Sequence, residues 1–131
     1  MQELTAGVNW YAVCSGCVAA FLVGWLWYSP VGFGRKWAAG VGVDLTKSPP
    51  LDAMIAQIIG LFLMSWFVGV TAVSQALLTV ILATLAAIAL AFSARGFSGH
   101  KMAARLIDAG FTLVALIIMI LAQGIGMSIT G

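Results

Sequence analysis

The sequence predicts an all-α integral membrane protein: an antiparallel four-helix bundle with a short interfacial helix in its first cytoplasmic loop. Three observations predict this class: the composition, the long uncharged segments and the placement of the basic residues. Of the 131 residues, 63% are hydrophobic and 8% are charged, and the mean hydropathy is +1.11. Because soluble domains carry about 25% charged residues, this composition excludes a soluble enzyme, a nucleic-acid-binding protein and a disordered tail.

The uncharged segments predict the number of spans. A helix needs about 20 largely apolar residues to cross a hydrocarbon core of roughly 30 Å. Residues 4–34 and 109–131 carry no charge and each predict one crossing. Residues 53–94 are also uncharged and are about twice as long as one crossing requires. The polar pair Ser74-Gln75 near their middle predicts a tight turn between two helices. The predicted spans lie at about 8–28, 53–73, 76–94 and 106–127, within a single domain of residues 1–131.

The basic residues predict the orientation. All six lie in the two loops 29–52 and 95–105, and neither terminal segment carries one. The positive-inside rule therefore predicts a multi-pass protein of the bacterial inner membrane, with both loops cytoplasmic and both termini on the periplasmic side. We do not expect a cleaved signal peptide in residues 1–28, because the start of this segment carries the acidic Glu3 instead of basic residues and its end carries interfacial aromatics.

The loop 29–52 contains an amphipathic segment. Phe33, Trp37 and Val41 are spaced by four residues, so a short helix would bury these side chains in the membrane surface and present its cations to anionic headgroups. We favour a plain interfacial anchor over a docking surface for a partner, since aromatic belts are common at this depth. The residues of this anchor or docking surface are Trp27, Tyr28, Pro30, Phe33, Arg35, Lys36 and Trp37.

Small residues recur at four-residue spacing along the predicted spans. Such stripes allow two helix backbones to approach closely. We expect them to pack within the monomer, although the sequence leaves open whether one stripe serves an outside partner. The stripes are Ala12, Gly16, Ala20 and Gly24 on the first span, Ala56 and Gly60 on the second, and Ala83, Ala87 and Ala91 on the third.

Asp108 is the one acidic residue within reach of a span. Arg105 precedes it by three residues on the same helix face, and Gln57 is a candidate hydrogen-bond partner from the second span. Ionisable groups inside membranes suggest proton or ion transport. We favour a structural ion pair or a helix cap, because acids are also stabilised near helix N-termini.

Cys14 and Cys17 form a CxxC pattern near the outer end of the first span. A membrane thiol–quinone enzyme would need such a pair, but also a second pair to pass oxidation to its substrates. We therefore favour small packing residues. His100 lies in a loop, where it would not ligate a cofactor inside a span, and the sequence has no cluster with metal-ligand spacing. We expect no cofactor and no metal.

Several segments are similar to a known family. Asn9-Trp10, then Gly24 to Pro30, then Phe33 to Trp37, resemble the first part of the Domain of Unknown Function 1761 family, and the segment from Arg105 to Phe111 resembles its last helix. The resemblance implies a small four-span membrane protein without an assigned activity. It does not include the cysteine pair. The motif positions that it implies are Trp27, Tyr28, Pro30, Phe33, Trp37 and Asp108.

These observations favour a non-enzymatic protein that acts by helix packing. It would be an accessory subunit of a larger inner-membrane complex, such as a respiratory or photosynthetic one, or a homo-oligomer. Its partners would be the lipid bilayer and other membrane subunits or further copies of itself, not nucleic acid. The alternatives are a small homo-oligomeric transporter or channel that uses Asp108, and a thiol–quinone redox protein that uses Cys14 and Cys17.

Overall fold

The computed structural model describes residues 2–29, 31–42 and 51–130, with side chains from residue 4 to residue 126 within these ranges. The described residues form helices and no strands, which confirms the predicted all-α class. Four of the helices are long and apolar enough to cross a bilayer, so the chain is a multi-pass membrane protein. The helices are α1 (Gln2–Thr5), α2 (Trp10–Trp27), α3 (Gly34–Val41), α4 (Leu51–Val73), α5 (Leu77–Phe97) and α6 (Met102–Thr130).

Local chemistry accounts for the helix ends. Asn9 caps α2, because its side chain accepts a hydrogen bond from the amide of Ala12 at 3.2 Å. The predicted tight turn separates α4 from α5, and Gln75 there adopts a left-handed φ of 55°. The second loop is shorter than predicted. Helix α5 continues through Arg95, since a cation is favoured in the last turn of a helix.

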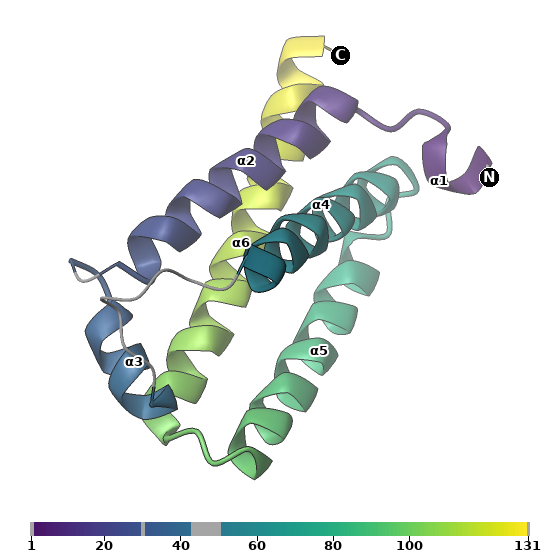
Figure 1. Ribbon diagram of the computed structural model, residues 1–131. Coiled ribbons are helices and arrows are strands. Elements are labelled where there is room, and N and C mark those ends of the chain that lie inside the picture. The colour runs from purple at the N-terminus through teal and green to yellow at the C-terminus, as the bar shows by residue number, and fades with distance from the viewer. Residues whose placement is uncertain (1, 30, 43–50, 131) are drawn as a thin grey trace.

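The long helices alternate in direction, and α6 lies at the centre of the bundle (Figure 1). It contacts α2, α3, α4 and α5. In its most apolar stretch 39% of the residues are buried, against 11% in α5, which lies at the edge. The core combines residues of the four long helices: Ala20, Leu61, Val68, Val80, Phe111, Ala115, Leu116 and Met119.

Helix α3 crosses the end of the bundle where the basic residues lie, which we call the basic end. The predicted short helix is therefore present, and it packs against the first turn of α6. A Cβ on Gly40 would lie 2.7 Å from the Cβ of Ala104. The Gly40 carbonyl accepts a hydrogen bond from the Lys101 amide at 3.0 Å. Arg35 and Lys36 are exposed, as expected for an interfacial helix.

The small-residue stripes have different environments. All four stripe residues of α2 are buried. A Cβ on Gly16 would lie 3.1 Å from Ser65 Oγ, and one on Gly24 would lie 2.8 Å from the Phe111 ring. The expectation that the α4 stripe packs inside the monomer is wrong: Ala56 is exposed, and a Cβ on Gly60 would meet no other part of the described chain within 4 Å. The reason is that α4 turns a different face, with Leu61, Ser65, Val68 and Gly69, toward the core.

The third span behaves like the second. Ala83 and Ala87 are exposed and Ala91 is half-buried, because α5 uses only a narrow face with Val80 and Thr84 to contact its neighbours.

Candidate functional site

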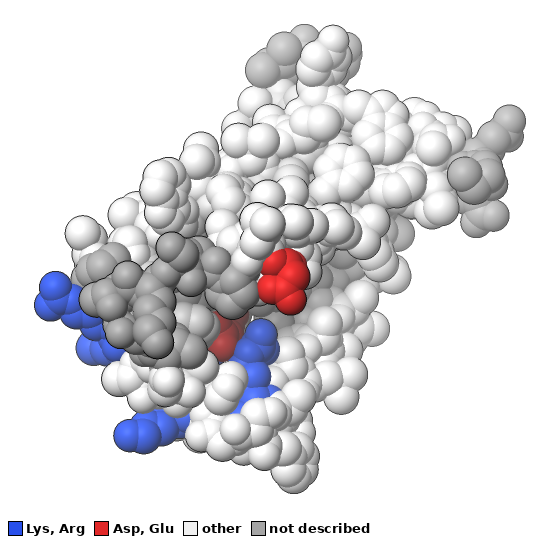
Figure 2. Space-filling model, viewed as in Figure 1, with Lys and Arg blue, Asp and Glu red and all other residues white. Residues whose placement is uncertain are grey.

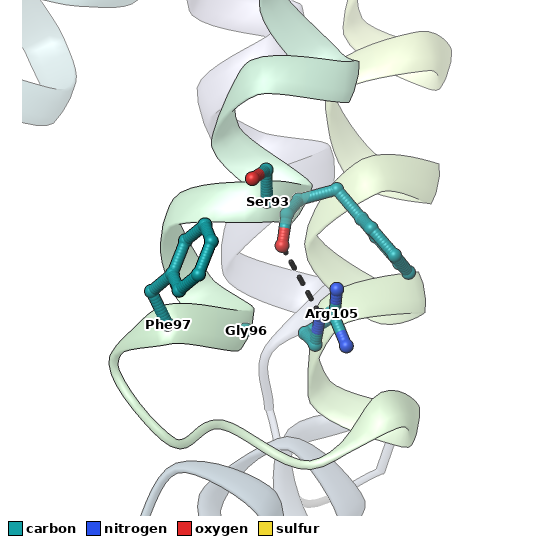
Figure 3. Close-up of a pocket in the computed structure, with 5 residues that line it drawn as sticks. Ser93, Gly96, Phe97 and Arg105 are labelled. Carbon is teal, nitrogen blue, oxygen red and sulfur yellow. Dashed lines mark hydrogen bonds between the residues drawn. The ribbon is translucent and has the colours of Figure 1, made fainter.

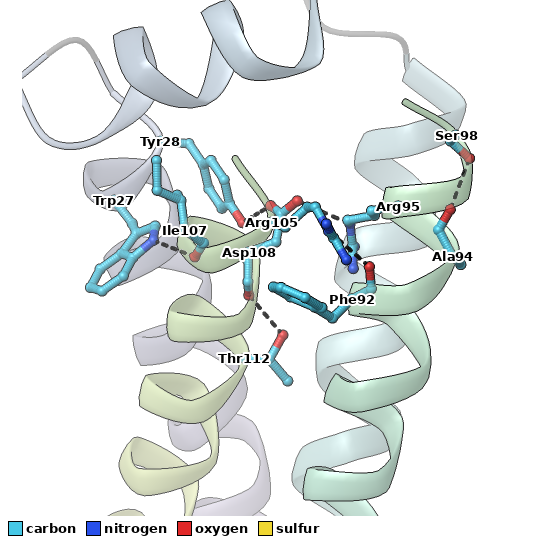
Figure 4. A network of polar contacts seen from close by, with 10 residues as sticks. All are labelled: Trp27, Tyr28, Phe92, Ala94, Arg95, Ser98, Arg105, Ile107, Asp108 and Thr112. Carbon is cyan, nitrogen blue, oxygen red and sulfur yellow. Dashed lines mark hydrogen bonds and ion pairs between the residues drawn. The ribbon is translucent and has the colours of Figure 1, made fainter. Parts of the chain in front are cut away.

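Asp108 is a buried carboxylate at the basic end, in the second turn of α6 and 8% exposed. Its two oxygens bind the side chain of Tyr28, the C-cap residue of α2, and that of Arg95 in α5 (Figure 4). The Tyr28 hydroxyl donates to Oδ1 at 2.5 Å, and Arg95 Nε donates to Oδ2 at 2.9 Å. Charge-assisted bonds of this kind are short and strong. They compensate a charge that would otherwise be costly to bury.

The aromatic side chains at the end of α2 hold this arrangement in place. Tyr28 lies edge-on to Trp37 of α3, with ring centroids 5.2 Å apart, and to Phe111 of α6, at 5.6 Å. The preceding residue, Trp27, donates from Nε1 to the Ile107 carbonyl at 3.1 Å. The last residue of α2 and the C-cap residue that follows it therefore bond to two consecutive residues of α6.

The expected pair of Arg105 and Asp108 does not form. Arg105 donates from Nε to the Phe92 carbonyl at 3.1 Å, and its guanidinium lies 3.9 Å from the centroid of the Phe92 ring. These contacts direct Arg105 toward α5 instead of along its own helix. The partner of Asp108 is Arg95 of α5.

Gln57 does not contact Asp108 either, since it is exposed on α4. The sequence did not indicate Arg95 as the partner of Asp108, because helical spacing relates only residues of the same helix. The one available indication was its charge in a chain with few charged residues.

The residues that the family resemblance indicated lie together in space. Trp27, Tyr28, Phe33, Trp37 and Asp108 form one connected group, in which the Trp27 ring also packs against the tilted Phe33 ring with centroids 4.8 Å apart. Pro30 lies outside the described residues, as does Lys47 of the same loop. The group joins α2, α3 and α6, so it acts as a clamp on the basic end of the bundle.

The other candidate residues are not members of this clamp. Cys14 is exposed, Cys17 is half-buried, and both thiols are free. His100 lies in the short turn between α5 and α6 and is half-buried. Among the described residues, no group of three His, Cys, Asp or Glu side chains could hold a metal ion.

The oxygen atoms of Asp108 are occupied by hydrogen bonds and an ion pair within the chain. Each oxygen of the Asp108 carboxylate already has a donor, and the carbonyl of the same residue accepts from Thr112 Oγ1 at 3.2 Å. Transport of a proton or ion through this group would require the Tyr28 or Arg95 contact to open. In the arrangement seen, the geometry suits tertiary stabilisation.

Residues 11–124 match the family described as "Protein of unknown function (DUF1761)". The match covers most of the chain, and the chain belongs to this family. No curated protein and no solved structure gives a significant match.

Proposed function

We propose that this DUF1761 protein is a non-enzymatic protein of the bacterial inner membrane that acts by binding another transmembrane helix. The other helix would belong to a larger membrane complex or to a second copy of the chain. The observation that carries this proposal is the exposed surface of Ala56, Gln57 and Gly60 on the first half of α4, which we call the α4 patch. In the orientation proposed here, the basic end faces the cytoplasm.

The α4 patch combines the two features that favour association of membrane helices. Ala56 and Gly60 are four residues apart and Gln57 and Gly60 are three apart, so the three lie on one face. Small residues allow close approach of a second backbone, and amide side chains hydrogen-bond across helix pairs. The patch therefore offers both contact area and a polar bond.

The Gln57 side chain favours association of the α4 patch with a second helix. The side chain is exposed and makes no hydrogen bond with any residue that the structure describes. An amide that faces lipid without a partner is costly, because hydrocarbon offers no donors or acceptors. A second helix that supplied a donor or acceptor would remove this cost.

The chain itself uses the same residue types for close helix contact. The stripe of α2 packs directly on α6 and α4, where Gly16 leaves room for Ser65 and the Met119 backbone. This use inside the bundle supports an equivalent use of the α4 patch with a helix from outside.

Cysteine cross-linking in native membranes tests the proposal. In a background with Cys14→Ala and Cys17→Ala, Gly60→Cys should form a cross-linked adduct under mild oxidation or with a short bifunctional thiol reagent. The matched control is Ile58→Cys, which is 48% exposed on the same helix and lies on another face. Mass spectrometry of the adduct distinguishes a second copy from a different subunit. Equal labelling at both positions, or no adduct from Gly60→Cys, would contradict the proposal.

Transport through Asp108 is a second candidate, favoured by the burial of this carboxylate beside two other helices. Its test is Asp108→Asn in liposomes reconstituted with the protein. Proton or solute flux that the substitution leaves unchanged would remove this candidate.

A further inference from the structure

A groove at the basic end lies between the last two turns of α5 and the first turn of α6 (Figure 3). Its volume is about 360 Å³, and its wall contains two aromatic side chains and one cation. We call it the α5–α6 groove. Its lining residues are Phe92, Ser93, Gly96, Phe97 and Arg105.

The cation is held in a defined position. Arg105 donates from Nε to the Phe92 carbonyl and stacks on the Phe92 ring. Gly96 leaves room for it, because a Cβ at this position would lie 2.7 Å from a terminal nitrogen of Arg105. These contacts fix the plane of the guanidinium group and use only one of its nitrogens.

The terminal nitrogens of Arg105 are available to a ligand. No hydrogen bond or ion pair joins them to any part of the chain that the structure describes, and the carboxylate of Asp108 is occupied by Arg95 and Tyr28. A fixed guanidinium with two free amino groups matches the geometry of a phosphate, which it can bind through two parallel hydrogen bonds.

The surroundings favour a negatively charged ligand with an apolar part. Among the described residues, the basic end carries the cations Arg35, Lys36, Arg95, Lys101 and Arg105 and the acids Asp52 and Asp108, and the cations gather visibly on this end in Figure 2. No acidic side chain lines the groove, so the ammonium of a zwitterionic headgroup would find no partner there. Phe97 is 91% exposed and offers an apolar surface.

We propose that the α5–α6 groove binds an anionic phospholipid of the leaflet at the basic end. The lipid phosphate accepts hydrogen bonds from the terminal nitrogens of Arg105, and an acyl chain lies against Phe92 and Phe97. Attraction of anionic lipids to basic residues at the membrane surface strengthens the binding. The inference does not depend on the proposed function, since the groove contains no residue of the α4 patch.

Native mass spectrometry of the full chain in mild detergent tests the proposal, with phosphatidylglycerol and phosphatidylcholine as probes. We expect one phosphatidylglycerol to bind about tenfold more tightly than phosphatidylcholine, a difference of about 1.4 kcal/mol. Arg105→Gln should remove this preference. The matched control is Lys101→Gln, which removes the same charge from the same end but lies outside the groove. This variant should retain the preference for phosphatidylglycerol.

A second variant tests the groove while Arg105 and its contact with Phe92 are kept. A loss of binding then cannot come from a weaker contact between α5 and α6. Ser93 is exposed, so Ser93→Trp should fill the groove, leave the fold intact and abolish the preference while every cation remains. Equal losses from Arg105→Gln and Lys101→Gln would show general charge attraction and overturn the site. So would a wild-type chain without preference for phosphatidylglycerol, or a Ser93→Trp variant that retains it.

Discussion

Helices α2 and α4 carry the same four-residue spacing of small side chains, yet the two stripes have opposite environments. A Cβ on Gly24 of α2 would lie 2.8 Å from the ring of Phe111, whereas a Cβ on Gly60 of α4 would meet no other part of the described chain within 4 Å. The difference arises from position in the bundle, because α2 lies along the central helix α6 and α4 turns another face to it. A stripe of small residues therefore indicates that a backbone can approach closely, and the tertiary fold determines which backbone does so.

The two helices also differ in how their ends at the basic side are held. Trp27 and Tyr28 fasten the end of α2 to Ile107 and Asp108. The polar contact of α4 with α2 comes a helix turn beyond Gly60, where Ser65 Oγ donates to the Val13 carbonyl at 2.7 Å. The first half of α4 is thus the less constrained region, which agrees with its proposed role as a contact surface.

The largest expected effect comes from a bulky residue in the α2 stripe. Gly24→Leu should destabilise the fold by about 3 kcal/mol, because even a bare Cβ would lie 2.8 Å from Phe111, whose ring is 5% exposed and packs on Tyr28. The measurement is the midpoint of thermal unfolding in mild detergent, with Gly60→Leu as the matched control. Equal midpoints for the two variants would contradict the conclusion that the α2 stripe is packed and the α4 stripe is exposed.

A smaller effect is expected from opening the clamp that holds α2. Asp108→Asn should lower the free energy of unfolding by about 2 kcal/mol, since it removes the charge from two hydrogen bonds in a buried site. Arg95 is 39% exposed and can reach solvent, so the cost stays below that of a fully buried pair. Thermal unfolding of Asp108→Asn, Arg95→Gln and the double variant measures the coupling. A double variant that costs the sum of the two single ones would mean that the ion pair contributes nothing.

The smallest effect on folding is expected in the α4 patch. Gly60→Leu should change the free energy of unfolding by no more than about 0.5 kcal/mol, because Gly60 is exposed and a Cβ there would meet no other part of the described chain within 4 Å. It should nevertheless block association, which native gel electrophoresis after mild extraction would reveal as a shift from a larger species to the monomer. An unchanged larger species, or a strong loss of stability, would argue against an exposed contact surface.

The elements of this protein could be predicted with little ambiguity, because helices in lipid must satisfy their own backbone hydrogen bonds and need a fixed apolar length. The turn at Ser74-Gln75 and the helix that contains Trp37 followed from local composition and spacing. The second loop was predicted too long because Arg95 and Arg105 were taken as loop residues, whereas charged side chains at a membrane surface are compatible with helical backbone.

The candidate site was predicted only in part. Asp108 stood out as the one acid near a span, and the family resemblance indicated Trp27, Tyr28 and Trp37 as motif positions without placing them in space. The identity of its cation could not be found in the same way. Arg105 shares a helix with Asp108 and satisfies the spacing rule, but Arg95 reaches the carboxylate from α5.

The sequence by itself determined the class, the number of membrane-crossing helices and the gathering of cations at one end, since these depend on length, apolarity and charge along a single chain. Only the tertiary structure decided which small-residue stripe is buried, which arginine pairs with Asp108 and where Arg105 lies open beside a groove. These features depend on the rotation of each helix about its own axis and on the choice of its neighbours. In a chain whose helices are apolar on nearly every side, periodicity carries little information about that rotation.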